Sequence, residues 1–189
     1  MQKLMKILGF ICLVASFLFY AQLANAQNRL VNIDFETGDI SGWARWAISD
    51  EVSSEENHTP DGQHSYNPSL NEPQASFEMG ALIQEFEDIA PGSKIDASCW
   101  IKTENLRGPS DSSVHAILKL EFWQDDEIIA TDEAGKLTDT NDWTKATIST
   151  TVPEGTTKAK YLLMLWNGGG LGSEGEAYFD DVSMMVSSY

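Results

Sequence analysis

Two adjacent aspartates interrupt a strand-like segment near the end of the chain. In AYFDDVSMM, residues 177–185, alternation places Tyr178, Asp180, Val182 and Met184 on one face. This face carries an aromatic ring, a valine and a methionine, so we expect it to face a hydrophobic core. Burying an ionised carboxylate costs several kcal/mol unless it is protonated, hydrogen-bonded or metal-bound. The sequence therefore requires a partner for Asp180.

Tryptophans that alternate with charged residues form a second chemically suggestive pattern. In VHAILKLEFWQ, residues 114–124, one face is uniformly apolar, and the opposite face carries His115, Ile117, Lys119, Glu121 and Trp123. An indole ring can stack on the C–H face of a sugar, while Glu, Gln and Asn side chains bind its hydroxyl groups. We therefore expect a sugar-binding sheet face that contains Trp123, Trp166, Trp100, Glu121, Gln84 and Asn167. The alternative is that one or more of these rings only cover the sheet beneath a loop.

The first 26 residues have the features of a signal peptide. Lys3 and Lys6 precede an almost wholly apolar run, and Ala24-Asn25-Ala26 supplies a small-x-small cleavage site. The apolar run is shorter than the roughly 20 residues that span a membrane. We expect residues 1–26 to be removed and residues 27–189 to be secreted as one domain, extracellular or periplasmic, without a membrane anchor.

The charge balance limits the classes of partner. Twenty-nine acidic residues against twelve basic ones give a formal net charge of −17. Such a surface repels nucleic acid and anionic membranes, because both are bound through Lys and Arg contacts to phosphate. We therefore expect a neutral or cationic partner, or bound cations. Only Cys99 remains after the signal peptide, so no intramolecular disulfide is expected.

Strand signals recur along the chain, with turn residues between them. ALIQEFEDI ends at Pro91-Gly92, and SKIDASCWIKT follows directly, which is typical of a turn between two strands. We count nine or ten such strands, and we find no convincing helix and no internal repeat. The pattern predicts an all-β protein in which two antiparallel sheets pack as a β-sandwich.

Four segments, taken in order, resemble the CenC-type carbohydrate-binding modules of families four and nine. They are IDFETGDISGWARW, IAPGSKIDASCWIKT, NDWTKATISTTVPEGTTKAKYLLML and AYFDDVSM, and the similarity covers residues 31–186. Residues 50–76 depart most from the family pattern. The resemblance implies a galactose-binding-domain-like jelly roll that binds a polysaccharide or oligosaccharide and has no catalytic activity of its own. Such modules usually belong to a glycoside hydrolase, and for this chain we expect action beside separate glycoside hydrolases.

The resemblance also implies a structural calcium ion between Glu36 and Asp180, with Asp61 as a further ligand. Ca²⁺ takes six to eight oxygen ligands, which separated loops can supply. The alternative is that Asp180 accepts backbone N–H groups at a strand end. In the family, a tryptophan recurs at the position of Trp100 whatever the ligand, which favours a structural role for this residue.

Two other functions remain open from the sequence. The same sandwich could be a calcium-stabilised structural or adhesive protein of the cell surface or matrix, with its outer tryptophans buried in a partner. It could also be a small jelly-roll enzyme that degrades polysaccharide, because its many carboxylates could supply an acid/base pair.

Overall fold

The computed structural model describes residues 27–46, 49–70, 78–110, 113–168 and 172–187, so the expected signal peptide lies outside the described part of the chain. The described residues form ten strands and no helix, and hence no helix that could span a membrane. The strands are β1 (Ala44–Trp46), β2 (Ser49–Ser53), β3 (Ser65–Leu70), β4 (Glu78–Phe86), β5 (Lys94–Arg107), β6 (Val114–Gln124), β7 (Glu127–Leu137), β8 (Asp139–Thr151), β9 (Lys158–Asn167) and β10 (Glu174–Ser187).

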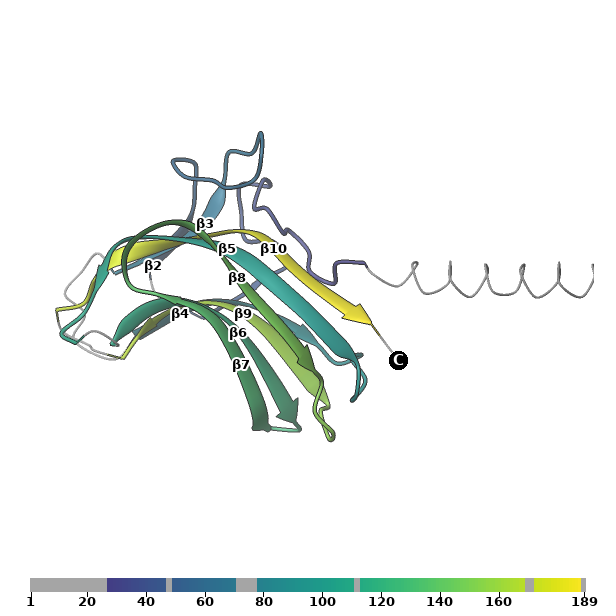
Figure 1. Ribbon diagram of the computed structural model, residues 1–189. Coiled ribbons are helices and arrows are strands. Elements are labelled where there is room, and N and C mark those ends of the chain that lie inside the picture. Colours follow the sequence, from purple (N-terminus) through teal and green to yellow (C-terminus); the bar gives the residue numbers. More distant parts are fainter. Residues whose placement is uncertain (1–26, 47–48, 71–77, 111–112, 169–171, 188–189) are drawn as a thin grey trace, which may run out of the picture.

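The strands form two antiparallel sheets of five, in the orders β1-β4-β9-β6-β7 and β2-β3-β10-β5-β8. The predicted two-sheet β-sandwich is therefore confirmed. Both sheets bend in the same sense, with the first sheet on the inside of the bend (Figure 1). We call the first the concave sheet and the second the convex sheet. We call the side of the concave sheet that points away from the core the tryptophan face.

Alternation of apolar and polar residues builds the core between the sheets. In β5, Ile95, Ala97, Cys99 and Ile101 are buried and the residues between them are not. Cys99 behaves as the small buried hydrophobe expected of a lone cysteine in such a strand. The two sheets are also joined by a hydrogen bond, because the Tyr161 hydroxyl in β9 donates to the Ser98 carbonyl in β5 at 2.8 Å.

The last strand contains a β-bulge at the two aspartates. The pairing of β10 with β5 shifts register between Asp180 and Ser183, and Asp181 has a positive φ of 48°. The core side of β10 therefore consists of Ala177 and Phe179 before the bulge and Val182 and Met184 after it. The expectation that Tyr178, Asp180, Val182 and Met184 share one core face was wrong, because the extra residue reverses the alternation between Asp180 and Val182.

The start and the end of the described chain lie side by side, as expected for this fold. Asn28 pairs with Met185, and the Arg29 N–H donates to the Met184 carbonyl at 2.9 Å. Further along, the Val182 N–H donates to the Ile33 carbonyl at 2.8 Å. This places Phe35, which is fully buried, in the core and brings the neighbouring Glu36 to the convex side of the sandwich, where it meets residues 63 and 64.

Candidate functional site

The tryptophan face has an apolar half built from three neighbouring strands. Cross-strand partners point to the same side of a sheet, and β4, β9 and β6 align Met79 with Trp166 and His115, then Ala81 with Met164 and Ile117. Ala81, Ile117, Leu162 and Met164 form an apolar cluster separate from the main core, with Met79, Ile83 and Trp166 packed against it. The sheet thus carries an apolar floor on its outward side.

Two tryptophans flank this floor. Trp166 is half-buried, with its ring centroid 6.4 Å from that of His115. Trp46 pairs with Ala81, stands on the edge strand β1, and leaves 56% of its surface exposed. β4 alone separates β1 from β9, and Trp46 is in register with Met164, two residues before Trp166, so the Cα atoms of the two tryptophans lie about 12 Å apart. Trp46 was not among the predicted residues, since three residues of strand give too little alternation to show where its side chain points.

The other half of the tryptophan face is charged. Trp123 and Glu121 both face outward, as predicted, and the Trp123 indole N–H donates to Glu121 Oε2 at 3.0 Å. Glu121 Oε1 pairs with Lys119 at 3.1 Å, and Lys160 pairs with Glu85 at 2.8 Å. A row of alternating lysines and glutamates therefore crosses β4, β9 and β6 beside the apolar floor.

Gln84 and Asn167, which were predicted to bind sugar, point to the core side of the concave sheet and not to this face. Gln84 alternates onto the core side of β4, where its side chain accepts a hydrogen bond from the Val31 N–H at 3.2 Å and donates one to the Val31 carbonyl at 2.9 Å. Asn167 is fully buried at the end of β9 and accepts a hydrogen bond from the Ser173 hydroxyl at 2.8 Å. Gln84 therefore stabilises the chain around Val31, and Asn167 stabilises the chain around Ser173.

Trp100 lies on the convex sheet and so cannot share a surface with Trp123 and Trp166. The His58 ring stacks on it, with centroids 3.9 Å apart and planes inclined by 17°, and Trp143 meets His58 edge-on. Lys145 Nζ lies 6.0 Å from the centroid of the Trp100 ring. The ring is therefore covered by the segment 54–64, in agreement with the structural role that the sequence favoured for it.

The partner of Asp180 is the same covering segment. Asp180 is fully buried, and its Oδ2 accepts the backbone N–H groups of His58 and Thr59 at 2.6 and 2.9 Å. Its Oδ1 accepts the N–H of Asp181 at 2.7 Å and lies 3.0 Å from the Thr59 hydroxyl. Burial raises the pKa of Asp180, and these hydrogen bonds act against that rise.

Glu36, in the irregular segment before β1, is held in the same manner. Its Oε1 accepts the N–H groups of Gln63 and His64 at 2.8 and 2.9 Å. Among the described residues, no group of three or more His, Cys, Asp or Glu side chains is arranged to hold a metal ion. In this arrangement backbone N–H groups bind Oδ2 of Asp180 and Oε1 of Glu36, and an N–H group cannot itself ligate a cation. Asp61 has a positive φ of 62° and lies in the turn between the residues that bind Asp180 and those that bind Glu36. We call the hydrogen bonds from the segment 54–64 to these two carboxylates the clamp.

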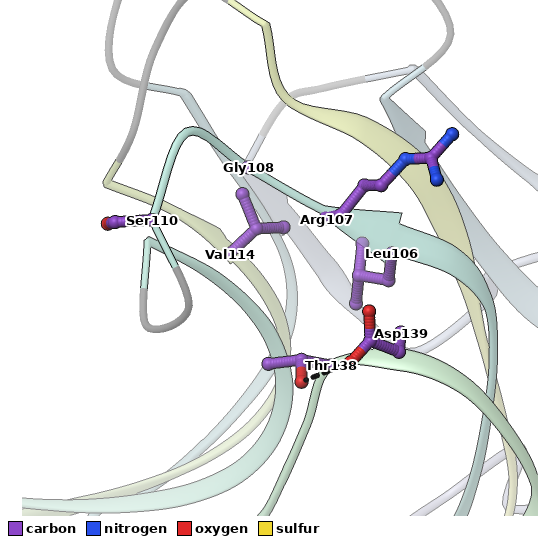
Figure 2. A pocket seen from close by; sticks show the side chains of 7 residues that line it. All are labelled: Leu106, Arg107, Gly108, Ser110, Val114, Thr138 and Asp139. Atoms are coloured by element: carbon purple, nitrogen blue, oxygen red, sulfur yellow. Dashed lines mark hydrogen bonds between the residues drawn. The ribbon is translucent and has the colours of Figure 1, made fainter.

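A cavity of about 90 Å³ lies apart from the tryptophan face, at the end of β5 (Figure 2). It is lined by Leu106, Arg107, Gly108, Ser110, Val114, Thr138 and Asp139, none of them aromatic. Arg107 points out of the cavity in Figure 2 and pairs with Glu174 at 2.5 Å. Nothing in this lining matches the stacking surface that a sugar ring needs.

Comparison with known protein families finds no match, and neither does comparison with curated proteins. Solved structures do match. The carbohydrate-binding module TmCBM61, in complex with β-1,4-galactotriose, has a TM-score of 0.58 and 20% identity over 84% of this chain and 98% of its own. A structure described as "Family 16 Carbohydrate Binding Module-2" has a TM-score of 0.59 and 17% identity over 83% of this chain and 99% of its own.

A further match is the enzymatically active domain of tailspike protein 4 from bacteriophage CBA120, with a TM-score of 0.62 and 16% identity over 84% of this chain. This chain spans only 21% of the tailspike structure's length. These likenesses confirm the jelly-roll fold that carbohydrate-binding modules share. They do not show membership of the CenC-type families in particular.

Proposed function

We propose that this protein is a secreted, non-catalytic module that binds a polysaccharide or oligosaccharide chain across the tryptophan face. The observation that carries the proposal is the placement of Trp46 and Trp166 at either side of an apolar floor, next to a row of lysines and glutamates on the same face. Indole rings and apolar side chains match the C–H faces of sugars, and charged side chains bind the hydroxyl groups.

The shape of the molecule supports the same surface. The tryptophan face is the inner side of the bend, so a long ligand would contact several strands at once (Figure 1). The structural neighbour TmCBM61 was solved with a galactotriose bound, which is a precedent for oligosaccharide binding on this fold. A module of this kind would act beside separate glycoside hydrolases and bring them to their substrate.

Calcium binding at Glu36, Asp61 and Asp180 stays a separate proposal. It requires the segment 54–64 to exchange the N–H donors now on Glu36 and Asp180 for oxygen ligands. Calorimetric titration of the chelator-treated protein tests it: uptake of Ca²⁺ that disappears in Asp180→Ala supports a calcium site. No uptake, or uptake that is unchanged in that variant, leaves the hydrogen-bonded clamp as the whole function of these carboxylates.

Affinity electrophoresis of residues 27–189 against soluble polysaccharides tests the main proposal. Retardation by one class of glycan, weakened by Trp166→Ala and unchanged by Trp143→Ala on the convex sheet, is the expected result. Absence of retardation by xylan, galactan, mannan and β-glucan would contradict it. The export step is tested separately, because mass spectrometry of the secreted protein should find its N-terminus at Gln27.

A structural or adhesive protein is the second candidate, and the exposure of Trp46 is the observation that favours it. In that case the tryptophan face would bind a protein partner and no glycan. A protein that shows no retardation in the electrophoresis panel, yet loses cell or matrix attachment in Trp46→Ala, would have this function. Release of reducing ends from any of the polysaccharides would instead reveal an enzyme.

A further inference from the structure

Protein groups already occupy the ring of Trp123, whereas Trp46 on the same face leaves 56% of its surface exposed. Lys160 Nζ lies 4.4 Å from the ring centroid and Lys158 Nζ lies 5.4 Å from it. At these distances the ammonium groups interact with the π-electrons of the indole. The polar edge of the ring is engaged as well, because its N–H donates to Glu121.

The groups around Trp123 are fixed on both sides. Lys160 is paired with Glu85 at 2.8 Å, and only 16% of the Lys160 side-chain surface is exposed. Glu121 is paired with Lys119 at 3.1 Å, and only 10% of the Glu121 side-chain surface is exposed. Trp123 therefore stands between two ion pairs from β4, β9 and β6 and contacts a member of each, Lys160 through its ring and Glu121 through its N–H.

This arrangement is unsuited to stacking a sugar. A sugar ring needs a bare indole face, and an ammonium group 4.4 Å from the centroid takes that position. At the other end of the face, Trp46 leaves more than half of its surface open. Stacking and hydroxyl binding are thus separated along the sheet, with the apolar half supplying the first and the ion pairs around Trp123 the second.

The charges of this half also restrict the ligand. Lys119, Lys158 and Lys160 each lie within 4.0 Å of a carboxylate, so the three positive charges are balanced by Glu85, Glu121 and Glu133. A glycan carboxylate would have to displace one of these glutamates and would remain beside the others, on a protein of net charge −17. Sugar hydroxyl groups meet no such repulsion, because they can donate to Glu121 and accept from Lys160.

We propose that Trp123 is a positioning residue that holds Glu121 and Lys160 as a hydroxyl-binding pair for an uncharged polysaccharide. This inference rests on the proposed glycan-binding function. It assigns Trp123 a role different from stacking, and it names neutral glycans as the substrate class.

A double-mutant cycle tests the positioning role. Wild type is first compared on xylan, β-1,4-galactan and β-glucan as neutral probes and on polygalacturonate and alginate as acidic ones. Calorimetry with the neutral polysaccharide that retards the wild type then compares Trp123→Phe, Glu121→Gln and the double variant. Glu174→Gln on the convex sheet is the matched charge control, and urea unfolding checks that each variant is folded.

We expect Trp123→Phe and Glu121→Gln each to weaken binding about three- to tenfold, the value of one hydrogen bond. Because the two side chains act together, the double variant should bind within about twofold of Glu121→Gln. Unchanged affinity in Trp123→Phe, or losses that multiply in the double variant, would overturn the positioning role, because Trp123 and Glu121 would then act independently. Retardation by polygalacturonate equal to that by neutral glycans would overturn the substrate class, and a wild type that binds none of the five would reject the glycan function itself.

Discussion

Oδ2 of Asp180 accepts the backbone N–H of His58 at 2.6 Å, which joins the last strand to a segment 122 positions earlier in the chain. The buried carboxylate that the sequence left without a partner is thus satisfied by main-chain donors from the segment that covers the convex sheet. Glu36 is held by the other end of that segment, through Gln63 and His64. Two carboxylates from distant parts of the sequence therefore fasten one irregular segment to the sandwich.

Replacement of Asp180 should destabilise the fold strongly. Asp180→Ala leaves the N–H groups of His58, Thr59 and Asp181 without their acceptor, so we expect a loss of about 3–5 kcal/mol in the free energy of unfolding. Asp180→Asn keeps one oxygen acceptor and should cost less. Urea unfolding measures both, with Asp142→Asn, an exposed carboxylate, as the control. A midpoint for Asp180→Ala equal to that of the wild type would contradict the clamp.

Acid should weaken the clamp through Glu36. Burial raises the pKa of Glu36, but the N–H donors of His64 and Gln63 outweigh burial, and the pKa lies below its usual 4.5. The stabilisation is therefore fully present above pH 4.5 and is lost as the pH falls through the lowered pKa. Asp180 has a raised pKa, so its contribution has the opposite sign and is lost as the pH rises through that value.

The Glu36 contribution can be isolated by substitution. The amide in Glu36→Gln cannot take up a proton as the pH falls, so the fall in Tm between about pH 5 and pH 3 should be smaller in this variant than in the wild type. Thermal unfolding followed by circular dichroism across this range measures the difference. Parallel curves for the two proteins would show that Glu36 does not contribute to acid unfolding.

The strands and the core could be predicted from sequence because alternation alone determines them. The run around Trp123 has five apolar residues on one side, and the structure buries that side. The bulge at Asp180 could not be predicted in this way. One extra residue reverses the alternation, and its cause lies in the segment 54–64, whose donors reach Asp180 and Asp181 from a distant part of the chain.

The candidate site was only partly predictable for a related reason. Alternation shows which residues share a face of one strand, but it does not show to which sheet that strand belongs. Trp100 and Trp123 both alternate with charged residues, yet β5 and β6 lie in different sheets. Gln84 and Asn167 have suitable side chains for sugars, but both point to the core side, where partners distant in the sequence bind them.

Gln84 should matter for stability and not for glycan affinity. Gln84→Leu keeps the size of the side chain but removes both hydrogen bonds to Val31, so we expect a loss of about 1–3 kcal/mol in the free energy of unfolding. Affinity for the polysaccharide that retards the wild type should stay within about twofold of the wild-type value, because Gln84 lies on the core side of β4. A loss of affinity as large as that of Trp166→Ala would place Gln84 in the binding site after all.

The two tryptophans at the apolar floor should carry most of the glycan affinity. A stacked aromatic ring at the centre of an interface is typically worth a tenfold loss or more on truncation, so Trp46→Ala and Trp166→Ala should each weaken binding at least about tenfold. Trp46 is exposed, so its removal should leave Tm unchanged, whereas the half-buried Trp166 should cost some stability. Calorimetry and thermal unfolding separate the two effects.

Trp100→Phe on the convex sheet is the matched control: it keeps an aromatic ring against His58 and should bind as the wild type does. If Trp100→Phe weakened binding while Trp46→Ala and Trp166→Ala did not, the glycan would lie on the convex sheet, because only that sheet carries Trp100.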